Sequence, residues 1–507
     1  MSWGRTDRPE LAWLALTTVL WAAVAASALA TQNIPARPEM LTFPELAFEI
    51  PRAEPIRHQL AGGVVVYVVE DHSLPLVDVS LRLRTGSFLE MPEQTGLANL
   101  MGTLMRSGGT EKLPPGELDE AIDSLAADIS MSVGETSGRA SMNCLTSQLD
   151  ACIELFFDML RSPRFDEERL ALQKSILIEE LGQRNDDPAG IARREWQWLL
   201  YGRDHFSSRR ITSSSLEAIG REDLVDFHRS YWGSDGMVIT VSGDIDTLTM
   251  LEKLAQQLAA WPTNAKPVPW PPPAPSYDPR PGVYSVEKDI PQGRVNIGHL
   301  GIQRDRWDEP EHFALQLMNR ILGGSGFSSR LLQRIRSDEG LAYSAGSSFD
   351  IASLYWPGTF SVFYQSKSES VALAAKIAVE EIDRMRSEEV SDQELETAKR
   401  SFIETLPGRF DSPRAVANIF AADEIFGRSH AYWYDYETNI GAVTKGEILR
   451  VARKYLHPEK LIFLIVGDWQ AIAKGDAGGR VSMEDILGGE VNTLPQRDPL
   501  TLEPLSP

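Results

Sequence analysis

The chain has 507 residues, a formal net charge of −22 and an apolar fraction of 42%. This length accommodates two to four domains, and this apolar fraction supports packed cores. Acidic residues outnumber basic ones, 72 to 50, without a basic stripe, which argues against a nucleic-acid partner. A negative surface attracts cationic peptides, although many soluble proteins are simply acidic.

A charge-free segment, residues 11–30, lies near the N-terminus after Arg5 and Arg8 and ends in Ala28-Leu29-Ala30. These features are typical of a cleaved signal peptide. The segment also has about the 20 residues that span a bilayer, so a retained N-terminal anchor, tethering the protein to a membrane, is the alternative. In both cases the rest of the chain, starting with a linker at residues 31–44, is expected outside the cytoplasm, in the bacterial periplasm.

The first half, residues 45–260, mixes strand and helix patterns. The apolar run at residues 64–69 and the alternating run at 77–84 predict strands. Helices are expected at residues 96–105, 115–126, 149–160 and 166–181. The last of these carries Leu170, Ile176 and Leu177 at helical spacing.

A proline-rich stretch at residues 261–281 predicts an extended connector without helix. The second half, residues 282–475, follows it, and residues 476–507 are expected to form a polar tail. Helices are expected at residues 310–322 and 329–336, and strands at 342–349 and 359–364. Strands and helices that come in runs, without strict alternation, favour an α+β fold in which helices pack on a largely antiparallel sheet.

The two halves contain a repeat. Residues 216–244 and 440–468 align without a gap at an offset of 224 residues, so that Tyr231 matches Tyr455 and Gly243-Asp244 matches Gly467-Asp468. Each copy predicts a helix followed by an apolar strand that ends in Gly-Asp. A repeat of this length indicates that one α+β domain was duplicated.

Cysteine and histidine give no metal pattern. The two cysteines, Cys144 and Cys152, form no C-x-x-C motif, and either a disulfide or two buried thiols is compatible with the sequence. No two of the eight histidines are spaced i, i+4, so no helical histidine pair is available to bind zinc.

Residues 96–110, GLANLMGTLMRSGGT, resemble the metal-binding helix of the pitrilysin/insulinase family of inverted zincins, which includes the mitochondrial processing peptidases. In that family the helix carries H-x-x-E-H, two zinc ligands and a general base. Here Asn99, Gly102 and Thr103 occupy those three positions. The resemblance covers residues 45–470 and implies a chain that cannot hold zinc by itself and is inactive alone.

A further position of the family pattern survives. The third zinc ligand of the family, a glutamate about 76 residues after the second histidine, corresponds to Glu180 in ILIEELGQRNDDP. One carboxylate does not make a zinc site, because catalytic zinc takes three protein ligands. Without the resemblance, the sequence around Glu180 indicates only a solvated helix face.

The second half offers the better catalytic candidate. Residues 322–344, LGGSGFSSRLLQRIRSDEGLAYS, resemble the family stretch whose Arg and Tyr, seven residues apart, bind the substrate backbone and stabilise the oxyanion. The matching residues are Arg336 and Tyr343. Gly323, Gly324 and Gly326 are not followed by G-K-[ST], so they do not form a phosphate loop. They are expected to allow a tight turn near bound peptide.

The resemblance implies the zinc-free subunit of a heterodimeric metalloendopeptidase that acts on peptides. The partner would be a homologous chain with H-x-x-E-H that holds the zinc, while this chain has no cofactor of its own. The alternative is a catalytically inactive scaffold for peptide binding or assembly. A homodimer with a different active site is a third hypothesis, for which the sequence provides no residues.

Overall fold

The computed structural model describes residues 48–505 apart from 262–265, 274–276, 305–309, 325, 352–354, 477 and 488–490. The charge-free segment at residues 11–30 and the linker predicted after it lie outside the described residues. Residues 50–507 form one compact unit. In the part of the chain that is described, no helix has the length and apolar character needed to cross a membrane.

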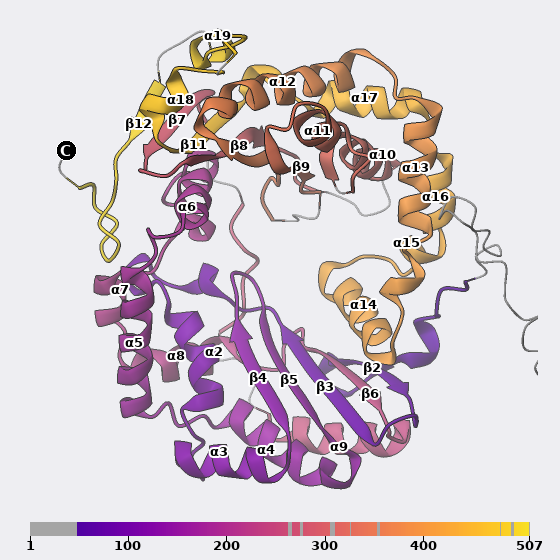
Figure 1. The fold of residues 1–507 in the computed structure, drawn as a ribbon. Helices are drawn as coiled ribbons and strands as arrows, with labels where there is room; N and C mark the ends of the chain where they lie inside the picture. The colour runs from indigo at the N-terminus through magenta and orange to yellow at the C-terminus, as the bar shows by residue number, and fades with distance from the viewer. Residues whose placement is uncertain are drawn as a thin grey trace, which may run out of the picture. The chain divides into compact units, whose positions relative to one another are not determined.

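The first half builds a six-stranded sheet in the order β1-β2-β6-β3-β5-β4 (Figure 1). Only β2 and β6 are parallel, and all other neighbours are antiparallel. The strands are β1 (Arg57–Gln59), β2 (Val65–Glu70), β3 (Leu76–Leu83), β4 (Asp128–Val133), β5 (Gly138–Leu145) and β6 (Val238–Gly243).

The second half builds a sheet in the order β12-β7-β11-β8-β10-β9. The strands β12, β7 and β11 are parallel, and the other neighbours are antiparallel. The strands are β7 (Gly282–Glu287), β8 (Gln292–Leu300), β9 (Ala342–Phe349), β10 (Thr359–Lys367), β11 (Ile462–Gly467) and β12 (Val491–Leu494). The predicted α+β class, with two largely antiparallel sheets, is confirmed.

Helices cover these sheets. Those of the first half are α2 (Leu97–Ser107), α3 (Pro115–Ser124), α4 (Leu149–Arg161), α5 (Glu167–Gly182), α6 (Pro188–Tyr201), α7 (Ser213–Glu217), α8 (Arg221–Tyr231) and α9 (Thr247–Ala259). Those of the second half are α10 (Pro310–Asn319), α11 (Arg330–Leu332), α12 (Val371–Ser387), α13 (Asp392–Ile403), α14 (Pro413–Phe426), α15 (Ala431–Tyr434), α16 (Tyr436–Ala442), α17 (Lys445–Tyr455), α18 (Trp469–Ala473) and α19 (Met483–Leu487). Apolar residues of α2, α4 and α8 form the core of the first half with one face of its sheet.

The repeat appears in the structure as a matching helix and strand. Helix α8 begins at Arg221 and α17 at Lys445, while β6 begins at Val238 and β11 at Ile462, and both steps are 224 residues. Each strand lies inside its sheet, between β2 and β3 or between β7 and β8. The central position explains why these strands are continuous apolar runs, since both of their faces are covered.

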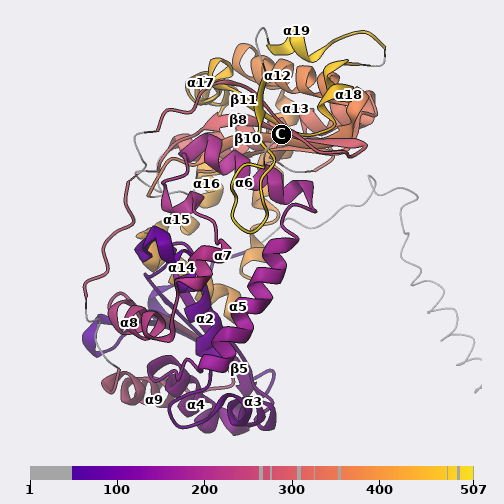
Figure 2. The same ribbon diagram turned by 90° about the vertical axis from the view of Figure 1, so that its left-hand side faces the viewer.

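The two halves exchange one helix each. Helix α6 of the first half packs on β8 and β11 of the second sheet, and α14 of the second half packs on β2 and β6 of the first (Figures 1 and 2). Ile191 of α6 shares a core cluster with Leu464 of β11. On the other side, Phe420 of α14 stacks on Tyr67 of β2 with ring centroids 6.3 Å apart.

The segment after residue 475, expected to form a polar tail, contributes a strand to the second sheet. Residues 491–494 form β12, which pairs with β7 at the edge of the second sheet. Beyond it, the Nε atom of Arg497 donates to Glu195 of α6 at 3.0 Å, and both side chains are only 3% exposed. Strand β12 was not predicted because the segment has a low apolar content. An edge strand buries little side-chain surface and pairs mainly through its backbone.

Candidate functional site

Helix α2 presents no metal ligands. Asn99 is exposed and Thr103 is half-buried. The Thr103 hydroxyl donates to the Asn99 carbonyl oxygen of its own helix at 3.1 Å. Among the described residues, no group of three His, Cys, Asp or Glu side chains is placed to hold a metal ion. The residues present therefore do not fit a zinc ion, which requires deprotonated N, S or O donors at this helix.

Gly102, at the position of the family's general base, is a packing residue. A Cβ atom added to it would lie 2.7 Å from the backbone nitrogen of Val133 and 3.0 Å from the carbonyl carbon of Ser132. Both atoms belong to the edge strand β4, which α2 crosses at close range. A side chain of any size is excluded here unless the helix or the strand moves.

Glu180 lies near the C-terminal end of α5 and is exposed. Helix α5 packs beside α2, so the glutamate stays on the same part of the fold as Asn99 and Thr103. Within the described residues it belongs to no group of three or more His, Cys, Asp or Glu side chains that could hold a metal ion.

Arg336 and Tyr343 lie together. The Arg336 guanidinium carbon lies 4.7 Å from the centroid of the Tyr343 ring, a cation–π contact. Arg336 belongs to a π-helical turn, η9 (Gln333–Asp338), and Tyr343 to the first residues of β9. The tyrosine side chain is 83% exposed, so its hydroxyl is available to a ligand.

A β-bulge directs Tyr343 outward. Tyr364 of β10 pairs with Ala345 of β9, and Ser366 pairs with Ala342, so one residue of β10 faces two of β9. Tyr343 and Ser344 are those two residues. Bulges of this kind turn a side chain away from the regular alternation and are frequent next to active sites.

Phe327 completes the cluster and was not predicted from the sequence. Its ring centroid lies 5.0 Å from the Arg336 guanidinium carbon, and its side chain is 74% exposed. Arg336 is thus in contact with two of the most exposed large aromatic side chains in the described part of the chain. The signal was present in the segment GSGFSSR, where an apolar residue follows a glycine-rich turn that cannot bury it.

The three glycines of this segment have different roles. A Cβ added to Gly323 would lie 2.6 Å from the backbone nitrogen of Ser347 in β9, and one added to Gly324 would lie 2.7 Å from the Asn319 side chain. Gly323 is buried, so packing rather than contact with substrate explains it. Gly326, with φ +83° and open space around it, provides the turn before Phe327.

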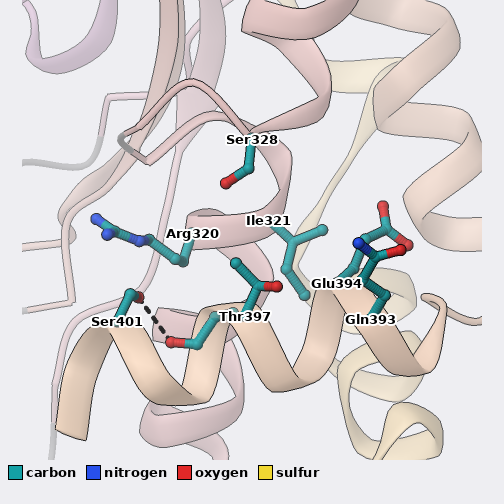
Figure 3. Close-up of a pocket in the computed structure, with 8 residues that line it drawn as sticks. Arg320, Ile321, Ser328, Gln393, Glu394, Thr397 and Ser401 are labelled. Atoms are coloured by element: carbon teal, nitrogen blue, oxygen red, sulfur yellow. Dashed lines mark hydrogen bonds between the residues drawn. The ribbon is translucent and has the colours of Figure 1, made fainter. Parts of the chain in front are cut away.

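A cavity of about 230 Å³ lies beside this turn, with Ser328 in its wall (Figure 3). Arg320, Glu394 and hydroxyl-bearing residues of α13 line the rest. Two of its polar side chains have partners: Glu394 accepts from Arg330 at 2.6 and 3.1 Å, and the Ser401 hydroxyl donates to the Ala398 carbonyl at 2.7 Å. The cavity supports the turn but offers no reactive group.

Two repeated α+β domains with a metal-binding helix that has lost its ligands define a protein built like the inverted zincins but without their zinc motif. The chain belongs to the insulinase family, peptidase family M16. Residues 65–197 match the insulinase (peptidase M16) domain, and residues 218–402 match the peptidase M16 inactive domain.

Relatives include a non-peptidase homolog YmxG of Helicobacter pylori, 25% identical over 363 residues, which are 71% of this chain and 82% of that protein. An uncharacterized zinc protease of Rickettsia bellii is 22% identical over 384 residues, 75% of this chain and 88% of the relative.

Two crystal structures share the fold. One is a peptidase M16 inactive domain from Pseudomonas fluorescens, with TM-score 0.70, 23% identity, and coverage of 81% of this chain and 97% of that chain. The other is a protease from Helicobacter pylori, with TM-score 0.71, 19% identity, and coverage of 83% and 100%. The family predicted from the sequence is confirmed, and relatives of the inactive type are among the matches.

Proposed function

We propose that this chain is the zinc-free subunit of a heterodimeric metalloendopeptidase and that it contributes Arg336 and Tyr343 to the partner's zinc site. The observation that carries the proposal is the contact between these two side chains at a β-bulge, where Tyr343 is exposed and Arg336 is half-buried. Arg336 makes no ion pair with a carboxylate in the described part of the chain, so its charge is available to a ligand.

The pair suits the hydrolysis of a peptide bond. Attack of water on the peptide carbonyl places negative charge on its oxygen, and preorganised donors near that oxygen stabilise the transition state more than the substrate. The guanidinium provides fixed donors and the phenol provides one more. In the partner, zinc held by H-x-x-E-H would supply the activated water.

Phe327 adds an apolar contact for the substrate. Its exposed ring lies against Arg336, so a peptide that reaches the guanidinium also meets this ring. An aromatic side chain has few rotatable bonds and therefore loses little entropy when it binds a ligand. The substrate class is an unfolded or short peptide, as the family resemblance implies.

A scaffold for peptide binding or assembly, without a catalytic role, is the second candidate. Two observations favour it: Gly102 leaves no room for a base on α2, and one relative is described as a non-peptidase homolog. Both candidates share an extracytoplasmic location, for which the charge-free residues 11–30 are the support. A reporter enzyme fused after residue 40 tests the location, because it should be active only outside the cytoplasm.

Kinetics on the pair of chains test the catalytic role. A companion chain with H-x-x-E-H, encoded next to this one or co-purified with it, is reconstituted with wild type, Arg336→Ala or Tyr343→Phe. We expect turnover to fall by about 10²-fold or more in each variant, mainly in kcat, because removal of one oxyanion donor has that effect. Assembly and the partner's zinc content should not change.

Two controls accompany this experiment. Arg400→Ala removes an exposed arginine of α13, and Asn99→Ala changes the degenerate helix α2. Both should leave turnover near the wild-type value. Unchanged turnover in Arg336→Ala and in Tyr343→Phe would refute the catalytic role and leave the scaffold.

A further inference from the structure

Three arginines lie at one end of the neighbouring strands β3 and β5 of the first sheet. Arg82 of β3 lies directly opposite Arg139 of β5 in the strand register. Arg84 lies in the bend just after β3 and lines a cavity together with residues of α14, the helix that carries Asn418, the partner of Arg82. Like charges in directly opposite positions destabilise a sheet, so this arrangement carries an energetic cost.

No carboxylate neutralises these arginines in the described part of the chain. Arg82 donates only to the amide oxygen of Asn418 at 3.4 Å, and Arg84 donates to the carbonyl oxygen of Val268 at 2.9 Å. The Nε atoms of Arg82 and Arg84 are buried without an acceptor. The acidic residue of the same strand, Asp78, is already paired with Arg414 at 3.1 Å.

The electrostatics agree with the geometry. Burial, and then the charge of Arg139, lower the pKa of Arg82 to about 10. No negative group offsets these two effects. An uncompensated basic cluster is notable in a chain with a net charge of −22, where carboxylates are abundant. An anion bound here would relieve both the repulsion and the two unsatisfied donors.

An apolar cavity lies beside Arg84, at one end of the arginine cluster. Arg84 forms part of the wall of a cavity of about 250 Å³, whose other members include Trp270, Tyr355 and Phe426. The Arg84 guanidinium carbon lies 4.0 Å from the centroid of the Trp270 ring, which is 5.9 Å from that of Tyr355. One water molecule occupies about 30 Å³ in the liquid, so the cavity has the volume of several water molecules. This is enough room for one large apolar side chain.

The single carboxylate in this wall is not available to a ligand. Glu424 accepts two hydrogen bonds from Arg57 and one from the Tyr67 hydroxyl, each at 3.0 Å. The cavity therefore combines an apolar interior with one unneutralised guanidinium at its edge. This combination selects a ligand with an apolar group next to a negative one.

We propose that the first sheet binds the carboxylate of an extended peptide through Arg82, Arg84 and Arg139, with the adjoining apolar side chain in the cavity. Guanidinium groups bind carboxylates through two parallel hydrogen bonds. The carboxylate comes from the peptide's C-terminus or from an acidic side chain, which have the same chemistry. The proposal rests on the proposed function only in taking a peptide as the ligand.

Binding to the isolated chain tests this site. Fluorescence anisotropy compares a labelled decapeptide that ends in phenylalanine with a free carboxylate, the same peptide amidated, and the amidated peptide with one internal aspartate. We expect amidation to weaken binding about tenfold or more, as loss of a charge-assisted contact does. Recovery by the internal aspartate would identify the side-chain carboxylate as an equivalent source.

The variants Arg82→Gln and Arg139→Gln should each weaken binding of the free-acid peptide about tenfold, whereas the matched control Arg400→Gln should not. Equal affinity for acid and amide, wild-type binding by both variants, or no saturation at about 1 mM peptide would overturn the proposal.

Thermal melting separates binding from a structural role. Removal of one member of a like-charge pair should raise the Tm of Arg82→Gln, while a structural arginine would lower it. This assay contains no partner chain, so its outcome does not depend on the proposed catalytic role. The carboxylate site and the catalytic role can therefore be refuted independently. Peptide binding through Arg82, together with unchanged turnover in Arg336→Ala, would refute the catalytic role and uphold the carboxylate site.

Discussion

Gly102 and Gly323 have similar surroundings in the two halves of the chain. In each half a glycine of a helical segment faces the backbone nitrogen of an edge strand, Val133 in β4 and Ser347 in β9, with room for no Cβ atom. From the sequence alone, Gly102 was interpreted as the position of a lost base and Gly323 as part of a binding turn. The close approach that explains both is a tertiary contact, so the local sequence does not reveal it.

The glycine at position 102 therefore limits any attempt to restore the metal site. We expect Gly102→Glu to lower the Tm, because an overpacked site costs about 1–3 kcal/mol or more when only backbone is available to move. The combined Asn99→His, Gly102→Glu, Thr103→His variant should be destabilised to a similar extent. Thermal melting followed by circular dichroism measures both.

Gly116→Glu is the matched control, since a Cβ at Gly116 in α3 would meet nothing within 4 Å. Its melting temperature should be close to that of wild type. A Gly102→Glu protein that melts together with the Gly116→Glu control would show that α2 and β4 are not in close contact.

His228 makes the stability of the folded protein depend on pH. Its Nε2 atom donates to the Leu160 carbonyl at 2.9 Å, and burial lowers the pKa of the ring to about 4. The unfolded chain binds this proton near pH 6.5, so the folded protein loses stability as the pH falls from about 6.5 to 4. The loss amounts to about 3 kcal/mol.

Urea unfolding between pH 7 and pH 4 measures this slope. His228→Gln keeps a donor for Leu160 but cannot be protonated, and it should show a smaller loss of stability in acid. The control is His58→Gln in the short edge strand β1, which should keep the full wild-type slope. A slope that is the same in wild type and His228→Gln would contradict the assignment.

At the scale of elements, the pairing of Arg336 with Tyr343 depends on features that no residue pattern shows. The expected helix at residues 329–336 is a short α11 that continues as the π-helical turn η9 up to Asp338. A bulge then turns Tyr343 out of β9. The family spacing of seven residues identified the pair, but the π-turn and the bulge bring the two side chains into contact.

Apolar patterning predicted most of the elements it was applied to and assigned some side chains to the wrong environment. Helix α5, expected at residues 166–181, spans Glu167–Gly182. Leu170 is buried as its spacing suggests, yet Ile176 is 40% exposed. Strand β4 was not predicted, although Ile129, Met131 and Val133 alternate with polar residues along it.

At the scale of the whole compact unit, residues 50–507, the repeat was predictable and the helix exchange was not. Two copies with the same helix and strand indicate two similar sheets. The amphipathic pattern of α14 shows that it buries one face, but not which sheet covers that face. Polar contacts and stacking between residues more than 350 positions apart determine which sheet α14 covers. Such contacts leave no local signal in the sequence.

Glu424 is the polar anchor of this exchange, and its loss should loosen α14 from the first sheet. In Glu424→Ala, the Arg57 guanidinium and the buried Tyr67 hydroxyl lose their shared acceptor. We expect a destabilisation of about 1–3 kcal/mol and faster amide hydrogen exchange across α14 than across α17. The control is Glu404→Ala, at an exposed position just after α13.

Arg57→Ala combined with Glu424→Ala should cost less than the sum of the single variants, because each single change leaves a partner uncompensated. Additive effects would mean that the two side chains act independently. Because α6 makes the reciprocal contact on the second sheet, loosening of α14 alone leaves the halves connected, and unfolding should remain a single transition with a lower midpoint. Separate transitions for the two halves in calorimetry would show that the exchanged helices do not couple them.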